Sequence, residues 1–344
     1  MKLLILTQKV DKNDSVLGFF HRWIEEFSKN FETVTVICLY KGEYSLPNNV
    51  KVLSLGKENG VSKIKYVLNF YKYIISERNN YDRVFVHMNQ IYVILGGLYW
   101  RMVGKKVYLW YTHKSVTATL KLSLIFLNKV FTASAESFRI KTNKLKVMSH
   151  GIDLDLFSFD QGKKYDNKLR LITVGRVSKS KDLLTILNSI LKIKDDVDVT
   201  LDIVGDAITS DDKLYFDNLK KFVGENGLDK IVAFHGPKTQ TQVVEYIKSA
   251  DLFIHTSTTG SLDKAALEAM ACGTLVMSSN DALLQILYPF GLTFKSGDAI
   301  FLSNELKNFS ANVKKDEIRV KLREMVERSH SLVNLIANLK NEIK

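Results

Sequence analysis

The sequence is poor in the features that mark secreted or membrane-spanning proteins. Its 344 residues include two cysteines, Cys38 and Cys272, and three prolines. Two cysteines far apart in apolar runs predict buried reduced thiols rather than a disulfide or a metal pair. No apolar stretch is long enough and free enough of charge to span a membrane, and the start MKLLILT is too short for a signal peptide. We therefore expect a cytoplasmic protein.

Several chemical signatures are also missing. No G-x-G-x-x-G follows either expected first strand, which argues against a dinucleotide-dependent dehydrogenase. No zinc finger, helix-turn-helix or RNP-like motif is present, so we expect no nucleic-acid partner. Ser261 to Lys264 fits the S-x-x-K box of penicillin-binding enzymes, but no Ser-Asp-Asn box accompanies it. We expect no metal site and no prosthetic group.

Positive charge is abundant, and it is concentrated in the first half. The net charge is +12; residues 1–157 carry 23 Lys and Arg against 12 Asp and Glu, and the remainder carries 26 against 25. Such asymmetry indicates an anionic partner for the first half. An anionic membrane surface fits, since each nearby Lys or Arg contributes about 1 kcal/mol. A merely basic, soluble surface is the alternative.

Short apolar runs alternate with helical patterns along the chain. Because most runs are continuous in Val, Ile, Leu and Phe, they predict parallel strands buried on both faces. The length and the renewed pattern after residue 160 predict an α/β protein with two doubly wound parallel sheets. The expected strands are Lys2–Thr7, Thr33–Leu39, Val50–Leu55, Arg83–Met88, Lys106–Thr112, Val130–Ala133, Leu145–Met148, Leu169–Gly175, Val199–Gly205, Ile231–His235, Leu252–His255, Leu275–Ser278 and Leu292–Phe294. The clearest expected helices are Leu183–Leu191, Lys213–Asn226 and Thr241–Ser249.

Doubly wound sheets bind ligands beyond the carboxyl ends of their strands. Gly175 follows an expected strand and permits a tight exit, after which Arg176 and Lys181 supply two cations. An arginine fork together with a lysine point charge suits a pyrophosphate. The alternative is a lysine-rich surface loop.

The segment from Thr256 to Gly273 is the most informative in the chain. A Ser/Thr/Gly turn feeds a helix whose N-terminus offers free backbone N–H groups and a positive dipole end to an anion. Glu268 lies about two turns further along, where it could accept hydrogen bonds from a ribose. The alternative is an ion pair between Glu268 and Lys264, although lysine before glutamate is the weaker order on a helix.

Two further stretches contain candidate cleft residues. His113 follows the strand around residue 110 and could hydrogen-bond a hydroxyl or assist proton transfer, although a lone histidine is often structural. His150 and Gly151 precede Asp153 where the halves join. Gly151 suggests a turn with positive φ, and Asp153 could cap it; a hinge without ligand contact is the alternative.

The stretch Ser62–Arg78 is amphipathic. Ile64, Leu68, Tyr71 and Ile75 share one side, and lysines lie elsewhere. A core-packing helix is the ordinary interpretation, yet its lysines could also contact lipid head groups.

Together these motifs resemble glycosyltransferase family 4 of the GT-B fold. The resemblance rests on Gly175-Arg176 with Lys181, the stretch from His150 to Phe157, and Glu268-Ala269-Met270-Ala271-Cys272-Gly273. The resemblance implies two Rossmann-like domains facing a cleft, with residues 1–155 on the acceptor side, 156–314 binding the donor, and a final helix 315–344 crossing back onto the first domain. It implies donor contacts at the following residues: Gly175, Gly236, Gly260, Ser261, Leu262, Asp263, Lys264 and Ala265.

The resemblance also implies the reaction. A sugar would move with retention, without metal, from a UDP- or GDP-sugar to a glycan or lipid-linked acceptor in cell-surface polysaccharide or glycolipid synthesis. Catalytic roles fall to His113, Arg176, Lys181 and Glu268, and cleft or acceptor contacts to Gly18, His150, Gly151 and Asp153. Gly18 alone remains of the family's first glycine-rich loop.

The sequence departs from the family pattern at four positions. The family has an E-x7-E segment whose second glutamate is Glu268 here, and Gly260 replaces its first glutamate. Asp263 and Asp182 stand where the family usually has glycine, and Lys264 is also unusual for the family. A non-catalytic nucleotide-sugar-binding or partner subunit, and a sugar-nucleotide 2-epimerase, therefore stay open as alternatives.

Overall fold

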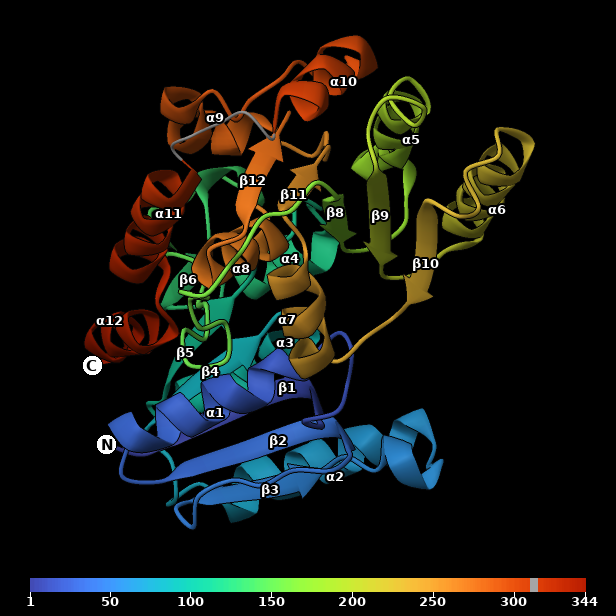
Figure 1. The fold of residues 1–344 in the computed structure, drawn as a ribbon. Coiled ribbons are helices and arrows are strands. Elements are labelled where there is room, and N and C mark those ends of the chain that lie inside the picture. The colour runs from blue at the N-terminus through green and yellow to red at the C-terminus, as the bar shows by residue number, and fades with distance from the viewer. Residues whose placement is uncertain (310–314) are drawn as a thin grey trace. The chain divides into compact units, whose positions relative to one another are not determined.

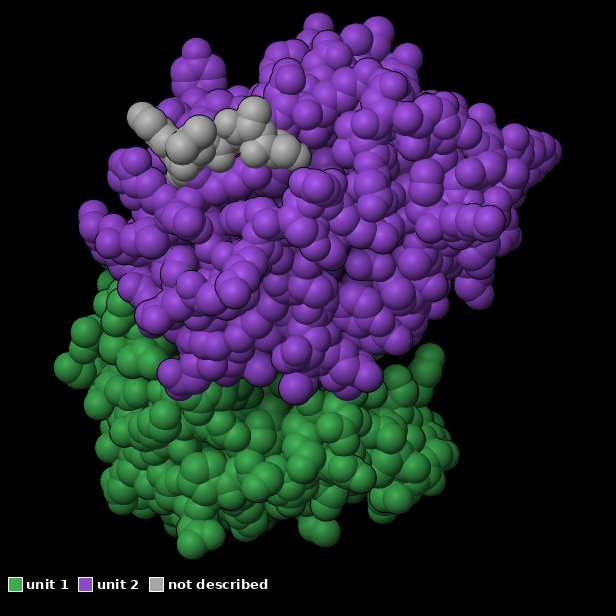
Figure 2. Space-filling model, viewed as in Figure 1, with its two compact units in different colours: residues 1–151, 332–344 green, residues 152–331 purple. Residues whose placement is uncertain are grey.

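The structure is a computed structural model that describes residues 1–309 and 315–344. The chain forms two compact units, coloured separately in Figure 2. Unit 1 comprises Met1–Gly151 and Leu332–Lys344, and unit 2 comprises Ile152–Ser331. Each unit contains one parallel sheet with helices packed on it, so the predicted α/β fold with two doubly wound sheets is confirmed.

Unit 1 is built on a seven-stranded sheet in the order β3-β2-β1-β4-β5-β6-β7. Its strands are β1 (Leu3–Val10), β2 (Val34–Lys41), β3 (Val50–Ser54), β4 (Arg83–His87), β5 (Lys106–Trp110), β6 (Lys129–Thr132) and β7 (Leu145–Val147). Every neighbouring pair is parallel. The strand order therefore reverses between β1 and β4.

The two faces of this sheet are covered by different helices. Leu3 and Ile5 of β1 join one core cluster, and Leu4 and Leu6 join another, because successive side chains of a strand point to opposite faces. The first face packs against α1 (Phe19–Asn30) and α12 (Leu332–Ile343), and the second against α2 (Lys63–Ser76), α3 (Ile91–Met102) and α4 (Ala118–Ser123).

Unit 2 is built on a five-stranded parallel sheet in the order β10-β9-β8-β11-β12. The strands are β8 (Leu169–Val174), β9 (Val199–Val204), β10 (Val232–Gly236), β11 (Leu252–His255) and β12 (Leu275–Ser278). The helices are α5 (Leu183–Leu191), α6 (Ser210–Glu225), α7 (Gln240–Ser249), α8 (Lys264–Cys272), α9 (Asp281–Leu287), α10 (Ala299–Asn308) and α11 (Lys315–His330). Helix α5 packs against α6 and α10, and α8 packs against α7 and α11.

The C-terminal segment differs from the expected single helix over 315–344. It forms α11 and α12, and only α12 belongs to unit 1; α11 packs on α8 within unit 2. Arg319 Nε donates to the Gly273 carbonyl at 2.6 Å, which fixes α11 to the end of α8. The units divide between Gly151 and Ile152, and the expected boundary at residue 314 lies outside the described residues.

Two further observations concern local structure. The expected strand Leu292–Phe294 is wrong: this segment makes only an isolated bridge between Ser278 and Thr293. Within residues 1–309 and 315–344, no helix is long and apolar enough to cross a membrane.

His87, at the end of β4, gives a prediction of pH-dependent stability. Its ring is 2% exposed and stacks on Phe20 with centroids 3.8 Å apart. Burial lowers the pKa of His87 to about 3. The unfolded chain therefore binds a proton near pH 6.5 that the folded chain excludes, so stability falls by about 2 kcal/mol between pH 7 and pH 5.

In urea unfolding at both pH values, His87→Gln should lose the part of the decrease that His87 contributes, about 2 kcal/mol. It should keep the part from His21 and His330, whose pKa values burial also lowers. The matched control His113→Gln replaces an exposed histidine and should keep the whole decrease. An identical pH dependence in wild type and His87→Gln would contradict the prediction.

Gly205, which follows β9, gives a prediction of local packing. A Cβ at this position would lie 1.9 Å from the Gly175 carbonyl oxygen, and φ is +137°. We expect Gly205→Ala to lower the free energy of unfolding by about 3 kcal/mol or more, from combined strain and overlap. Gly227→Ala, at φ +64° with its nearest neighbour 4.0 Å away, should cost only about 1 kcal/mol of strain. Equal urea midpoints for the two variants would refute the steric argument.

Candidate functional site

The strongest candidate site lies at the carboxyl ends of β8 and β11. These strands are hydrogen-bonded neighbours, with Leu171 opposite Leu252, and the strand order of unit 2 reverses between them (Figure 1). Such a reversal is where doubly wound sheets bind ligands. The structure brings the Gly175–Lys181 loop and the Thr256–Asp263 loop together at this point.

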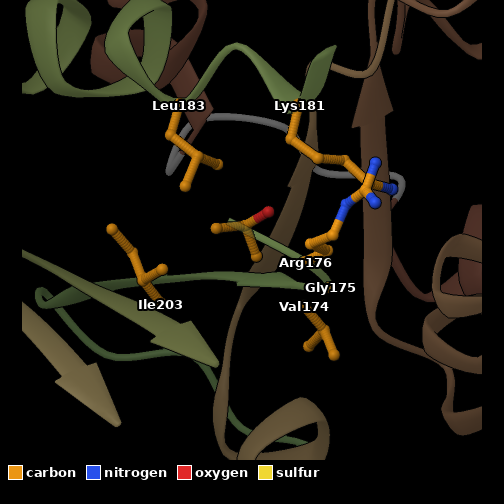
Figure 3. Close-up of a pocket in the computed structure, with 7 residues that line it drawn as sticks. Val174, Gly175, Arg176, Lys181, Leu183 and Ile203 are labelled. Atoms are coloured by element: carbon orange, nitrogen blue, oxygen red, sulfur yellow. The ribbon is translucent and has the colours of Figure 1, made fainter. Parts of the chain in front are cut away.

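The loop after β8 makes the tight exit that the sequence predicted. Gly175 has a φ of +142°, and its N–H donates to the Val204 carbonyl at 2.9 Å. Arg176 follows with a side chain that is 48% exposed and whose Nε lies 3.8 Å from an Asp212 oxygen. Gly175, Arg176 and Lys181 line one small hollow at the end of β8 (Figure 3).

The loop after β11 is tied to the loop after β8 by short polar contacts. Thr256 Oγ1 donates to the Lys181 carbonyl at 2.6 Å, and the Thr258 N–H donates to the Ser180 carbonyl at 2.9 Å. Ser261 Oγ lies 3.2 Å from Thr259 Oγ1. The two loops therefore form one continuous surface, because side-chain and backbone groups of the second loop bind backbone carbonyls of the first.

Asp263 is the most connected carboxylate of the site. Its Oδ2 contacts Lys181 Nζ and accepts from His255 Nε2 at 3.1 Å, and its Oδ1 accepts from the Ala265 N–H at 3.1 Å, which caps α8. Burial opposes its ionisation, but the charge of Lys181 and the His255 hydrogen bond hold the pKa of this carboxyl well below its usual value. Lys181 and the start of α8 thus already bind an anion, which belongs to the chain itself.

Glu268 forms the ion pair that the sequence analysis disfavoured. Lys264 Nζ lies 3.0 Å from Glu268 Oε1, and Gln240 Nε2 donates to the same oxygen at 3.2 Å. The weak lysine-before-glutamate order does not prevent the contact, because Glu268 is only 6% exposed and a buried carboxylate needs a partner. Burial raises the pKa of Glu268 above its ordinary value, and Lys264 opposes this rise.

The departures from the family pattern have clear backbone settings. Gly260 has a φ of +63°, a left-handed conformation that a glutamate adopts at a cost. Asp182 has a φ of +45° at the start of α5, where its side chain accepts from Thr185 Oγ1 at 2.7 Å. Two of the expected donor contacts are also placed by the structure: Gly236 ends β10 at φ +66°, and Leu262 packs on the core of unit 2.

In unit 1, His113 lies in the loop after β5 and is exposed. Its Nδ1 accepts from the Ser115 N–H at 3.1 Å, which orients the ring. Gly18 precedes α1 in a loop that leaves no space for a side chain, since a Cβ would lie 2.4 Å from the Asp14 carbonyl oxygen. These two residues follow β5 and β1 respectively.

The junction residues have structural roles in the chain. The expected positive φ at Gly151 is wrong; a Cβ here would lie 2.8 Å from a Leu332 methyl group of α12, so a larger residue would require the α12 side chains to repack. Asp153 accepts from the N–H of Asp155 at 3.2 Å, so it orders the turn as proposed. His150 is half-buried beside them.

The apolar side of α2 does not pack into the core. The helix contacts the sheet through Phe70 and Ile74, which are fully buried. Ile64 is 74% exposed and Leu68 is 58% exposed, and Tyr71 and Ile75 of the same stripe are also exposed. The core-packing interpretation is therefore wrong for this stripe, which we call the α2 stripe (Ile64, Leu68, Tyr71 and Ile75).

His255 is the site residue that sequence reasoning missed. It is 3% exposed, ends β11 and contacts Asp263. Its position at a strand end is the same signal that indicates His113. In the described part of the chain, no group of three His, Cys, Asp or Glu side chains could hold a metal ion.

Part of unit 2 matches a known protein family. Residues 156–285 match the family described as "Glycosyl transferases group 1". The D-inositol 3-phosphate glycosyltransferase of Paenarthrobacter aurescens is 25% identical over 148 residues, which are 40% of this chain and 35% of that protein. The chain thus aligns with about a third of the length of this curated relative.

Solved structures are similar over the whole chain. HepE of Anabaena, in complex with UDP and glucose, has a TM-score of 0.75 at 17% identity and covers 99% of both chains. Sucrose-phosphate synthase of Thermosynechococcus elongatus has a TM-score of 0.74 at 15% identity, with 99% of this chain and 98% of that chain covered. The chain therefore has the GT-B fold, and residues 156–285 carry the sequence pattern of group 1 glycosyl transferases.

Proposed function

We propose that the protein is a retaining, metal-independent glycosyltransferase of family 4. It transfers a sugar from a nucleoside-diphosphate sugar to a glycan or lipid-linked acceptor. The proposal rests on one observation: Lys181 and the N-terminus of α8 both bind the carboxylate of Asp263, beside Gly175 and Arg176. Groups that bind this anion can also bind a diphosphate. The UDP in HepE and the match of residues 156–285 support a nucleotide donor.

In the proposed complex the donor diphosphate lies at the ends of β8 and β11. Lys181 supplies a point charge, and Arg176, whose guanidinium is half exposed, can turn its fork onto the phosphates. Backbone N–H groups from Ser261 to Ala265 add the positive end of α8. Gly236 begins the loop that leads to Gln240, and Gln240 and Glu268 would meet the ribose.

These groups assist the step in which the glycosidic bond breaks. Negative charge then grows on the β-phosphate, and donors already aimed at it lower the barrier by about 3 kcal/mol each. One phosphate oxygen takes the proton of the acceptor hydroxyl as the new bond forms. His113 would hold a donor-sugar hydroxyl or the phosphate.

The acceptor belongs with unit 1 in this proposal. Unit 1 carries 25 Lys and Arg against 11 Asp and Glu, whereas unit 2 carries 24 against 26. The exposed α2 stripe is flanked by Lys63, Lys65 and Lys72, which are also exposed. Apolar side chains among lysines suit the interface of an anionic membrane. We propose a peripheral protein of the cytoplasmic leaflet, acting in cell-surface polysaccharide or glycolipid synthesis.

A second candidate function is a nucleotide-sugar-binding subunit without turnover. Gly260 favours it, because the family glutamate is absent and the left-handed backbone disfavours any replacement. Incubation with donor, first alone and then with acceptors, separates the candidates. Hydrolysis of the donor alone indicates an enzyme, epimerised donor indicates a 2-epimerase, and donor that stays unchanged in both incubations indicates a binding subunit.

Lys181→Ala tests the donor site. A thermal-shift panel of UDP- and GDP-sugars first identifies the donor, since bound ligand raises the melting temperature. With that donor we expect kcat for transfer to fall by about 100-fold or more, because one charged phosphate contact is lost. Lys179→Ala, which removes an exposed lysine of the same turn, should transfer normally. Wild-type kinetics in Lys181→Ala, with an unchanged circular dichroism spectrum, would sink the assignment.

The membrane proposal is tested by flotation with vesicles. Wild type should float with phosphatidylcholine–phosphatidylglycerol vesicles at low salt and dissociate at high salt. The double variant Ile64→Ser, Leu68→Ser should bind about tenfold more weakly, since several methylene groups no longer enter the interface. Leu214→Ser removes a residue of unit 2 that is 63% exposed and should change nothing. Equal flotation of all three proteins, or none, would count against the α2 stripe.

A further inference from the structure

Three donors from separate elements converge on the carboxylate of Asp263. Lys181 comes from the turn after β8, His255 from the end of β11, and the Ala265 N–H from the first turn of α8. The two oxygens divide these contacts, with Lys181 and His255 on Oδ2 and Ala265 on Oδ1. The Asp263 side chain retains 19% exposure, which leaves it a path to solvent.

Hydrogen bonds on the far side of the His255 ring hold it in place with Nε2 toward Asp263. Ser278 Oγ accepts from the Asn280 N–H at 3.0 Å and lies 3.0 Å from His255 Nδ1. Because a carboxylate oxygen can only accept, Nε2 carries a proton and donates to Asp263 Oδ2. Ser278 and Asn280 are buried, which keeps this arrangement fixed.

A lysine ammonium, an imidazole N–H and a helix N-terminal N–H also make a set of donors that suits a phosphate. In this protein the carboxylate of Asp263 accepts from all three donors. A phosphate that approached Lys181 would meet the negative charge of Asp263, and like charges at such a separation repel. The site can hold one anion at a time.

Building on the proposed function, we propose that Asp263 is an internal occupant of the phosphate site. The donor diphosphate displaces its carboxylate from Lys181, His255 and the start of α8, so Asp263 sets the affinity for diphosphates. His255 is then a third hydrogen-bond donor to the phosphate rather than a buried structural histidine. Glycine, the usual residue at this position in the family that the sequence resembles, has no side chain to compete.

The test is titration calorimetry with inorganic pyrophosphate and with UDP. Asp263→Asn and Asp263→Ser both keep a side chain that can cap α8 while removing the charge. We expect each to bind pyrophosphate about tenfold more tightly than wild type, because the competing anion is gone. Adding Lys181→Met or His255→Phe to Asp263→Asn should reverse the gain.

The matched control is Asp298→Asn. Asp298 caps α10 of the same unit through a hydrogen bond from the Phe301 N–H at 2.9 Å, so this variant makes the same change of charge at another helix start. It should bind pyrophosphate as wild type does. Equal or weaker binding by both folded Asp263 variants would overturn the proposal and make Asp263 a residue that positions Lys181.

Pyrophosphate contains no nucleoside or sugar, so this comparison stands apart from the proposed activity. If no nucleotide sugar stabilises the wild type and no transfer occurs, the proposed function fails, while the pyrophosphate affinities still decide the role of Asp263.

Discussion

The parallel pairing of β8 with β11 is the constraint on which the candidate site depends. It sets Leu171 beside Leu252 and Ile172 beside Phe253, and both strands then end at the same edge of the sheet. The loops that leave this edge are tied together by the bond from Thr256 Oγ1 to the Lys181 carbonyl, across 75 positions of sequence. A group on either loop acquires its partner only through this pairing. Lys181 without β11 would be a surface lysine, and Asp263 without β8 would be an ordinary helix cap.

Electrostatic pairing within unit 2 shapes the chemistry of that edge. Lys181 is held by Asp263 and Lys264 by Glu268, so two lysines near the proposed phosphates are already neutralised. Arg176 is different, because its side chain is half exposed and its nearest carboxylate oxygen lies 3.8 Å away. In the proposed complex, Arg176 would give up a longer contact than Lys181, whose ion pair with Asp263 is direct. Binding of the proposed diphosphate would then exchange one set of ion pairs for another.

The sequence predicted the two sheets well because their strands are buried on both faces and read mostly as continuous apolar runs, as in residues 3–6 of β1. It failed where the outcome depends on tertiary contacts. The space at Gly151 is limited because α12 packs against it from nearly 200 residues away, as the Leu332 contact shows, and no local turn signal reveals this. The Lys264–Glu268 pair forms because Glu268 is buried, which an isolated-helix rule does not include. The importance of His255 appears only once Asp263 lies beside it.

The two units handle charge in opposite ways, and this bears on how the proposed reaction would be organised. In unit 2, positive and negative residues nearly balance at 24 and 26, so selectivity there depends on individual contacts such as those of Asp263. Unit 1 contains 25 positive and 11 negative residues. The electric field of this excess charge extends roughly 8–10 Å at moderate salt, and its attraction does not depend on exact contact geometry. A long-range field suits a large anionic surface, and the exposed apolar α2 stripe supplies the short-range contact that a field alone lacks. A small diphosphate, by contrast, is best recognised by donors at fixed positions. The uneven distribution of charge between the units therefore fits the two partners that we propose, one large and one small.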